Sequence, residues 1–224
     1  MPTFVDVLSS DRFATYQHWA DGDDALALRL YTFNVQLSAA LYGPLHMLEV
    51  TLRNRADAQL MTVYGPDWLD DPVALPGRYQ RDCVIKARAT LLGERKAASH
   101  GQMVAELTFG FWTSLFGRDG THLWQHLRPI FQAKGIQRGL IAGQLRDLRH
   151  LRNRVAHYEP ILTQPLAQRY GNLTTLTGWL SPTAAAWIAQ TSAWGALYPA
   201  VPVLVPNAAG DLRVEPAVIP FLPA

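Results

Sequence analysis

Residues 140–157 read LIAGQLRDLRHLRNRVAH, and this stretch has the most regular helical pattern in the chain. On a helical wheel with Arg146 at the origin, its apolar side chains fall between about 120° and 260°. They are Leu140, Ile141, Leu145, Leu148, Leu151 and Val155. The stretch therefore predicts an amphipathic helix over about residues 136–158, with its apolar side packed into a helical core.

The opposite face of this predicted helix is rich in hydrogen-bond donors. Arg146, His150, Asn153 and His157 lie within about 40° of the origin, and Arg149 and Arg154 flank them. Asn153 and His157 are four residues apart, so they are direct neighbours on a helix. One face of a single helix thus presents several groups that can bind an anion.

Arg152 departs from this pattern, because at about 240° it falls inside the apolar stripe. A buried guanidinium is costly unless it is paired. We therefore expect Arg152 to meet a carboxylate or to reach out of the stripe towards the polar face. Glu49 and Asp57, on the helix predicted over 44–64, are the preferred partners. An ordinary structural ion pair is one interpretation of this arrangement, and a functional arginine is the other.

The rest of the chain is also dominated by helical periodicity, which predicts an all-α fold. Helices are expected over residues 24–42, 44–64, 79–99, 103–116, 121–131, 166–178 and 183–194. Gly43-Pro44 is expected to interrupt the first pair. The helix over 79–99 is long and basic, and Ser181-Pro182 is typical of an N-cap followed by a first helical residue.

The last 26 residues differ in composition, because they hold six of the 15 prolines. Prolines at this density exclude a central strand. We expect a short β-hairpin or an arm that packs on the helices or on a second subunit. The predicted organisation is a helical domain over 1–198 and a Pro-rich arm over 199–224.

The charge of the chain is unevenly distributed. The 224 residues are 49% hydrophobic and 17% charged, which excludes intrinsic disorder, and the net charge is only +2. Residues 78–157 nevertheless hold 14 basic and 5 acidic side chains, whereas residues 1–77 hold 4 basic and 10 acidic ones. This pattern predicts a basic cleft beside an acidic flank, and a polyanion as partner.

Cysteine content and the N-terminus predict a cytoplasmic protein. A single cysteine, Cys83, cannot form an intrachain disulfide. The N-terminus has no basic and apolar regions typical of a signal peptide. The apolar stretches are shorter than the ~18 residues that a membrane span needs, so no membrane association is expected.

The polar face of the helix over 136–158 suits phosphodiester cleavage in RNA. Histidine transfers protons near neutral pH, and arginine binds phosphate oxygens in bidentate fashion. The attacking 2′-OH belongs to the substrate, so this chemistry requires no metal. His150 and His157 are seven residues apart with no carboxylate between them on that face, so neither a metal site nor a cofactor is expected.

Residues 151–160, LRNRVAHYEP, resemble the signature of the Abi-like (abortive infection, AbiD/AbiF-type) family of the HEPN superfamily. In that family an arginine, usually followed by asparagine, precedes a histidine by four to six intervening residues. Here four residues lie between Arg152 and His157. Residues 48–55, LEVTLRNR, and 107–112, LTFGFW, are further landmarks that resemble the family. The resemblance spans about residues 25–195.

This resemblance implies an all-α HEPN-like bundle with additional helices, often a homodimer. It also implies a metal-independent endoribonuclease used in phage defence or in a toxin–antitoxin system. Carried over by position, Arg152 would stabilise the scissile phosphate, His157 would act as general acid or base, and Asn153 would orient them. The supporting or RNA-binding residues would be Glu49, Arg53, Arg146, Arg149, His150, Arg154 and Tyr158. RNA, a second copy of the chain and an antitoxin are the implied partners.

The wheel constrains the proposed pair, because Arg152 and His157 lie about 140° apart on one helix. Either Arg152 bends round, or the site takes its arginine and histidine from facing protomers of a dimer. The tetrapeptide LRNR also occurs at 52–55, where Ala58 stands in the position that His157 has in the second copy. We expect Arg53, flanked by Glu49 and Asp57 at i±4, to be structural or to bind phosphate.

Two other functional classes stay open at this stage. The first is a non-catalytic RNA- or nucleotide-binding module that keeps the motif as scaffold. The second is a protein-interaction subunit that uses the Pro-rich tail.

Overall fold

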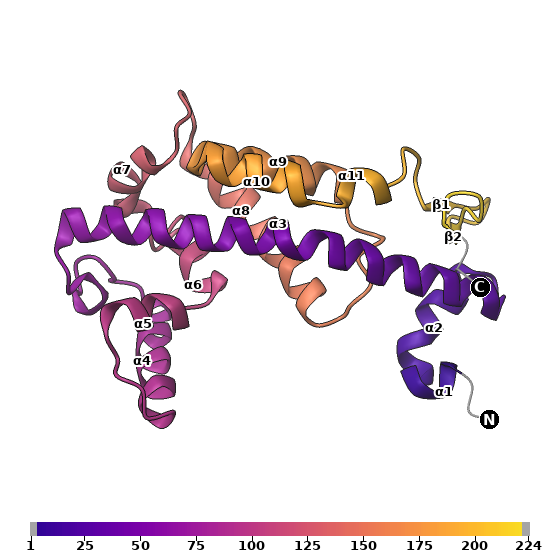
Figure 1. The fold of residues 1–224 in the computed structure, drawn as a ribbon, viewed down its shortest axis with the longest axis horizontal. Coiled ribbons are helices and arrows are strands. Elements are labelled where there is room, and N and C mark those ends of the chain that lie inside the picture. Colours follow the sequence, from indigo (N-terminus) through magenta and orange to yellow (C-terminus); the bar gives the residue numbers. More distant parts are fainter. Residues whose placement is uncertain (1–3, 221–224) are drawn as a thin grey trace. The chain divides into compact units, whose positions relative to one another are not determined.

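The computed structural model describes residues 4–220 and is mostly helical, with a two-stranded antiparallel hairpin near the C-terminus (Figure 1). The predicted helical class and the short hairpin are both confirmed. The chain forms two compact units. Unit 1 takes its residues from Met1–Gly43, Arg154–Leu166 and Ser192–Ala224, and unit 2 from Pro44–Asn153 and Ala167–Thr191.

The longest element is α3, Asp24–Tyr64, and Pro44 lies inside it. The predicted break at Gly43-Pro44 is therefore wrong. Proline removes one backbone donor and crowds the preceding turn, which costs a helix about 3 kcal/mol. Burial offsets this cost, because leucines on both sides of the proline are at most 2% exposed. These leucines are Leu30, Leu37, Leu41, Leu45, Leu48 and Leu52.

Unit 1 combines short helices, the first part of α3 and the hairpin. Its other elements are α1 (Phe4–Leu8), α2 (Ser10–Trp19), α11 (Trp194–Leu197), β1 (Leu204–Pro206) and β2 (Leu212–Val214). Aromatic rings form its core. The Tyr16 ring packs edge-on against the rings of Trp19 and Tyr31, with ring centroids 5.7 Å and 5.3 Å apart, respectively. In the hairpin, Val205 pairs with Arg213, whose guanidinium also lies 3.6 Å from the Asp21 carboxylate.

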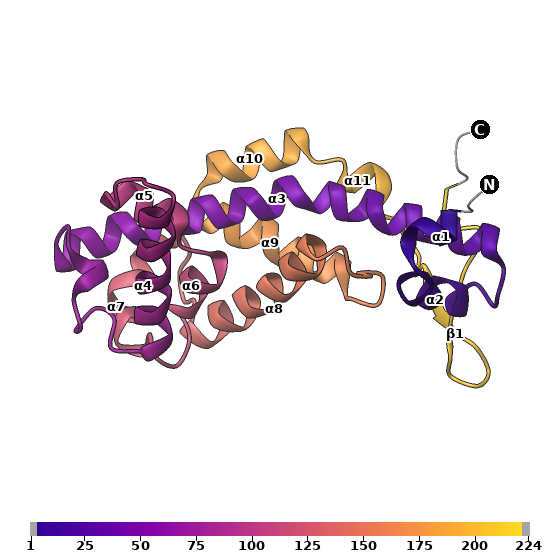
Figure 2. The same cartoon turned by 90° about the horizontal axis from the view of Figure 1, so that it is seen from below.

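Unit 2 contains the second part of α3 and most of the remaining helices. These are η1 (Trp68–Asp70), α4 (Arg78–Gly93), α5 (His100–Glu106), α6 (Phe109–Ser114), η2 (Thr121–Leu123), α7 (Trp124–Leu127), η3 (Arg128–Ile130) and α10 (Pro182–Thr191). Unit 2 also contains α8 (Arg138–Ala156) as far as Asn153, and α9 (Leu166–Leu180) from Ala167 onward. Trp68, Phe111 and Trp112 are fully buried, and their ring centroids lie 5.0–6.2 Å apart. Helices α4 and α5 pack side by side (Figure 2).

The predicted long basic helix is wrong beyond Gly93. Arg95 adopts a left-handed backbone conformation (φ 57°), and the Lys96 N–H donates a hydrogen bond to the Leu91 carbonyl at 2.8 Å. This C-cap ends α4. A new helix then starts at His100, where Ser99 N–H donates to Gln102 Oε1 at 3.3 Å. This Ser-x-x-Gln pattern is a capping box, and it was visible in the sequence.

Three further predictions meet the structure with different outcomes. The expected helix over 103–116 is divided at Leu107–Thr108 into α5 and α6. Helical periodicity over residues 79–99 predicts Leu92 on the apolar side, together with Val84, Ala87 and Leu91, but Leu92 is 61% exposed. The N-cap at Ser181 is confirmed, because Ala184 N–H donates to its Oγ at 3.2 Å. Within residues 4–220, no helix is long and apolar enough to cross a bilayer.

Candidate functional site

Helix α8 carries most of the predicted site. Its buried side is formed by Ile141, Leu145, Leu148 and Leu151, as expected from the wheel. Leu140, at the edge of the predicted stripe, is 49% exposed, so its assignment to the core was wrong. The stripe holds the helix against the core of unit 2 and directs the opposite face to solvent.

Arg152 pairs with Glu49 of α3, as the sequence predicted. Its Nε lies 3.4 Å from Glu49 Oε2. The arginine side chain is 39% exposed and the glutamate side chain 19%, so the guanidinium is half-buried rather than enclosed. This contact engages Nε and requires neither terminal nitrogen of the guanidinium.

The expected role of Arg53 in the first LRNR copy, structural or phosphate-binding, stays a prediction. Asp57 Oδ1 accepts a hydrogen bond from the Trp68 indole at 2.9 Å and lies 2.8 Å from His100 Nε2. Arg53 Nε donates to its neighbour Asn54 at 3.4 Å. The two carboxylates expected to flank Arg53 thus bind other groups: Glu49 binds Arg152, and Asp57 binds Trp68 and His100.

The polar face of α8 is open to solvent in unit 2. Arg146, His150 and Asn153 are all exposed. Arg146 Nε lies 3.1 Å from the carboxylate of its neighbour Asp147. These side chains are therefore accessible to a ligand, as the wheel predicted.

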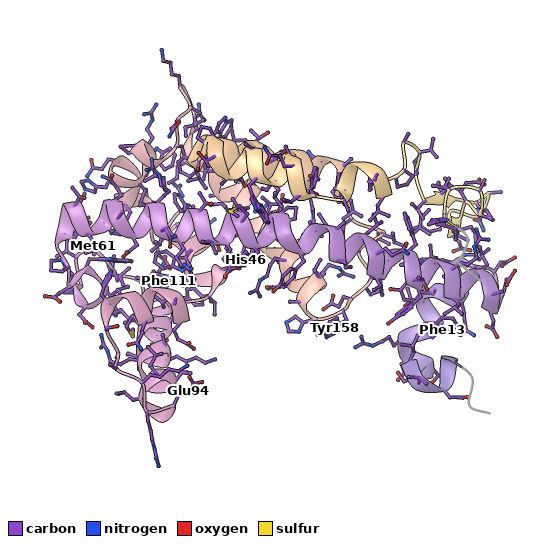
Figure 3. The ribbon with its side chains drawn as sticks, viewed as in Figure 1. Phe13, His46, Met61, Glu94, Phe111 and Tyr158 are labelled. Carbon is purple, nitrogen blue, oxygen red and sulfur yellow. The ribbon has the colours of Figure 1, made fainter. Side chains whose placement is uncertain are left out.

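His157 occupies the C-cap of α8, in unit 1, and its side chain is exposed. The next residue, Tyr158, has a left-handed backbone with φ 58°. Tyr158 N–H donates to Val155 O at 3.2 Å and Glu159 N–H to Arg154 O at 2.9 Å. This is a Schellman cap with a tyrosine where glycine is usual. The Tyr158 side chain is 76% exposed (Figure 3).

Arg154 fixes the turn that follows the histidine. Its Nε and Nη2 donate to the Pro160 carbonyl at 3.0 and 2.6 Å, and its Nη1 lies 3.2 Å from the Glu159 carboxylate. Buried Asn34 of α3 accepts the Ile161 N–H at 2.8 Å. Arg154 is therefore a positioning residue for the turn beside His157 in unit 1.

The predicted site residues fall into both units. Glu49, Arg53, Arg146, Arg149, His150, Arg152 and Asn153 belong to unit 2, and Arg154, His157 and Tyr158 belong to unit 1. Within unit 2 the structure brings Glu49 and Arg152 together. The approach of Arg152 to His157 stays a prediction.

Sequence reasoning missed three residues on a surface pocket of unit 2. Tyr79, Arg118 and Arg138 line this pocket together with the predicted Arg146 and Arg149. Arg138 lies on the same helical face as Arg149, so extending the wheel to the start of α8 would have found it. Tyr79 and Arg118 come from other segments, and no local pattern links them to α8.

Metal-ligating side chains do not gather in the described part of the chain. Within residues 4–220, no group of three or more His, Cys, Asp or Glu side chains is arranged to hold a metal ion.

Comparison of the chain with protein-family models, with curated proteins and with solved structures returns no match.

Proposed function

We propose that the protein is a metal-independent endoribonuclease of the HEPN type, acting in a bacterial phage-defence or toxin–antitoxin system. The observation that carries this proposal is the run from Arg152 to His157. It combines an Arg–Asn pair with a histidine that is exposed at the C-cap of α8. Exposure matters because a general acid or base must reach the substrate.

The proposed reaction is an intramolecular transesterification. The 2′-oxygen of the substrate attacks phosphorus while a histidine accepts its proton, and the bond to the 5′-oxygen breaks. The products are a 2′,3′-cyclic phosphate and a 5′-hydroxyl, whose proton comes from an imidazolium. His157 would transfer the proton, and Arg152 would offset the charge that develops on the non-bridging oxygens.

Glu49 and Asn153 would have supporting roles. The ion pair with Glu49 restricts the orientation of Arg152 at Nε, so a terminal nitrogen can bind a phosphate oxygen. Asn153 is exposed on α8, and its amide can orient phosphate or imidazole. A homodimer that combines Arg152 of one protomer with His157 of the other is part of this proposal.

Cleavage without metal tests the proposal directly. Purified protein should cut RNA in the presence of EDTA and leave a 2′,3′-cyclic phosphate. His157→Ala and Arg152→Ala should each reduce cleavage by about 10²-fold or more, the range for losing general acid–base or electrostatic catalysis. Arg53→Ala is the comparison variant: it removes an arginine from the LRNR copy that lacks the histidine, and it should act mainly through stability.

Two results would contradict this function. One is cleavage that stops on chelation, and the other is a His157→Ala protein that cuts RNA as fast as wild type. Growth and RNA integrity should be followed together in cells expressing each variant. Loss of growth without RNA cleavage would also count against the nuclease.

A second candidate function is RNA or nucleotide binding without turnover. The arginine-lined pocket of unit 2 favours it, because binding a phosphate there requires no proton transfer. This candidate predicts salt-sensitive binding that His157→Ala leaves nearly intact, with no cleavage by the wild type.

A further inference from the structure

A pocket of about 540 Å³ lies in unit 2, between α8, the start of α4 and the segment over 113–119. We call it the arginine pocket. The charged and phenolic side chains that line it are Tyr79, Arg118, Asp119, Arg138, Arg146 and Arg149. Asp119 is the one carboxylate among these described lining residues, and Asp147 outside the lining pairs with Arg146, so four guanidinium groups meet two carboxylates. Such an imbalance favours an anionic ligand.

The wall that α8 contributes is made of small residues. Gly139, Ala142 and Gly143 line the pocket between the arginines of the helix. A Cβ atom added at Gly139 or Gly143 would meet no heavy atom within 4 Å. The helix backbone is therefore open to a ligand along this wall.

Arg138 is held in place before any ligand arrives. Its Nη1 donates to the carbonyls of Phe116 and Gly117, both at 3.0 Å. A guanidinium fixed in this way loses little further freedom on binding, and its remaining N–H groups keep a planar geometry that suits phosphate oxygens.

Tyr79 and Arg149 converge at Gly110 of α6. A Cβ at this glycine would lie 2.9 Å from the Tyr79 hydroxyl and 3.9 Å from Arg149 Nη1. A phenol is protonated at neutral pH, and burial, followed by a hydrogen bond with Cys83, raises the pKa of Tyr79 further. It can then donate to an anion beside the guanidinium, and its half-exposed ring offers a face to a base.

Gln80 adds a buried polar group to the same wall. It is 3% exposed and lines the pocket, and its Oε1 has no hydrogen-bond partner in the described part of the chain. Buried amides are normally satisfied. This oxygen can only accept, so it suits a donor such as a ribose hydroxyl and not the phosphate itself.

We propose that the arginine pocket binds the phosphate group of a ribonucleotide, either free or within an RNA strand. The arginines and the Tyr79 hydroxyl would hold the phosphate, and the Tyr79 ring would contact the base. The pocket is far larger than a bare phosphate requires and lies in the range of small-molecule sites. Binding here needs neither His157 nor Arg152, so the inference goes beyond the proposed nuclease and rests instead on the second candidate function, for which it names the site and the ligand.

Gly143 offers a test that leaves the fold intact. Gly143→Glu introduces a carboxylate beside the arginines, and Gly143→Gln introduces a neutral side chain of the same size. Both are better helix formers than glycine, so neither should lower stability. Lys134→Gln, in an exposed loop outside the pocket, matches the change in net charge.

The measurement is calorimetric titration at low salt with 5′-AMP, adenosine and a short single-stranded RNA. We expect Gly143→Glu and Arg149→Gln each to weaken binding of the phosphorylated probes by about ten-fold or more, as loss of a charge-assisted contact predicts. Gly143→Gln should weaken it by less than about three-fold, well under that charge-assisted range. Lys134→Gln should bind as wild type does. Thermal denaturation of each variant checks that the fold is retained.

The probes separate the two sources of the phosphate. Binding of 5′-AMP, with none of adenosine, supports a free nucleotide, whereas binding of RNA alone supports a strand. Equal binding of adenosine and 5′-AMP, or wild-type binding by Gly143→Glu, would overturn the proposal. Cleavage assays keep it distinct from the nuclease: a His157→Ala protein that still cuts RNA contradicts the nuclease assignment and leaves the pocket unaffected.

Discussion

Arg152 Nε lies 3.4 Å from Glu49 Oε2, which joins the last part of α8 in unit 2 to α3. Both side chains are partly exposed, and ion pairs in this environment contribute only about 0–1 kcal/mol to folding. The main effect of the pair is therefore on the orientation of the guanidinium. A role for Glu49 in function can be measured apart from its effect on stability.

Glu49→Gln is expected to reduce RNA cleavage by about ten-fold, because the amide holds Arg152 less firmly than a carboxylate does. The free energy of unfolding should change by less than about 1 kcal/mol. Single-turnover cleavage and urea denaturation measure the two effects. Asp70→Asn is the control, since it removes the carboxylate of an exposed ion pair with Arg88, outside the proposed site. Equal cleavage by Glu49→Gln and wild type would show that the pair does not position Arg152.

Tyr158→Gly is expected to raise the free energy of unfolding by about 0.5–1 kcal/mol, because a residue with a Cβ atom is strained in the left-handed region of backbone conformation and glycine is not. Tyr158 has φ 58° and is 76% exposed, so little packing is lost with the ring. Urea denaturation measures the gain. Tyr158→Ala is the control, since alanine keeps the Cβ that causes the strain. If the ring contacts RNA, both variants lose cleavage, and the strain is then retained for function.

Asp57→Ala is expected to destabilise unit 2 by about 2–3 kcal/mol, because it leaves the Trp68 indole N–H buried without an acceptor. Trp68 is fully buried and donates to Asp57 at 2.9 Å, and His100 shares the same oxygen. Asp57→Asn keeps an acceptor and should cost less than half as much. A loss of cleavage by Asp57→Asn at full stability would contradict a purely structural role.

The sequence predicted the features that depend on one helix at a time. The wheel placed Ile141, Leu145 and Leu148 in the core, and it anticipated that Arg152 would need a carboxylate. These predictions hold because helical periodicity alone determines which side chains share a face.

Features that depend on several segments could not be predicted in this way. Pro44 was expected to end a helix, but buried leucines on both sides keep α3 continuous. Tyr158 carries a left-handed cap without the glycine that usually signals one. The arginine pocket joins α8 to Tyr79 and Arg118, which are distant in sequence, so only the tertiary structure reveals it.

The stability of unit 1 is expected to fall at alkaline pH because of Tyr16. This residue is 1% exposed, and burial, followed by the nearby Tyr31, raises its pKa above the ordinary value of 10.0, against smaller opposing effects of Arg12 and Arg154. The unfolded phenol ionises as the pH passes 10.0, while the folded one stays protonated. Unfolding then releases a proton, so the stabilising contribution is complete below that pH and is lost progressively above it.

Tyr16→Phe removes the ionisable group and should reduce this loss. Between about pH 9 and pH 11 the free energy of unfolding of the variant is expected to fall less steeply than that of wild type. Urea denaturation followed by circular dichroism measures both slopes, and values at neutral pH provide the baseline for any packing difference. Tyrosines that do not interact with Tyr16 contribute equally to both proteins and cancel in the comparison. Parallel slopes for the two proteins would mean that Tyr16 ionises as readily in the folded chain as in the unfolded one, which its burial among Trp19 and Tyr31 argues against.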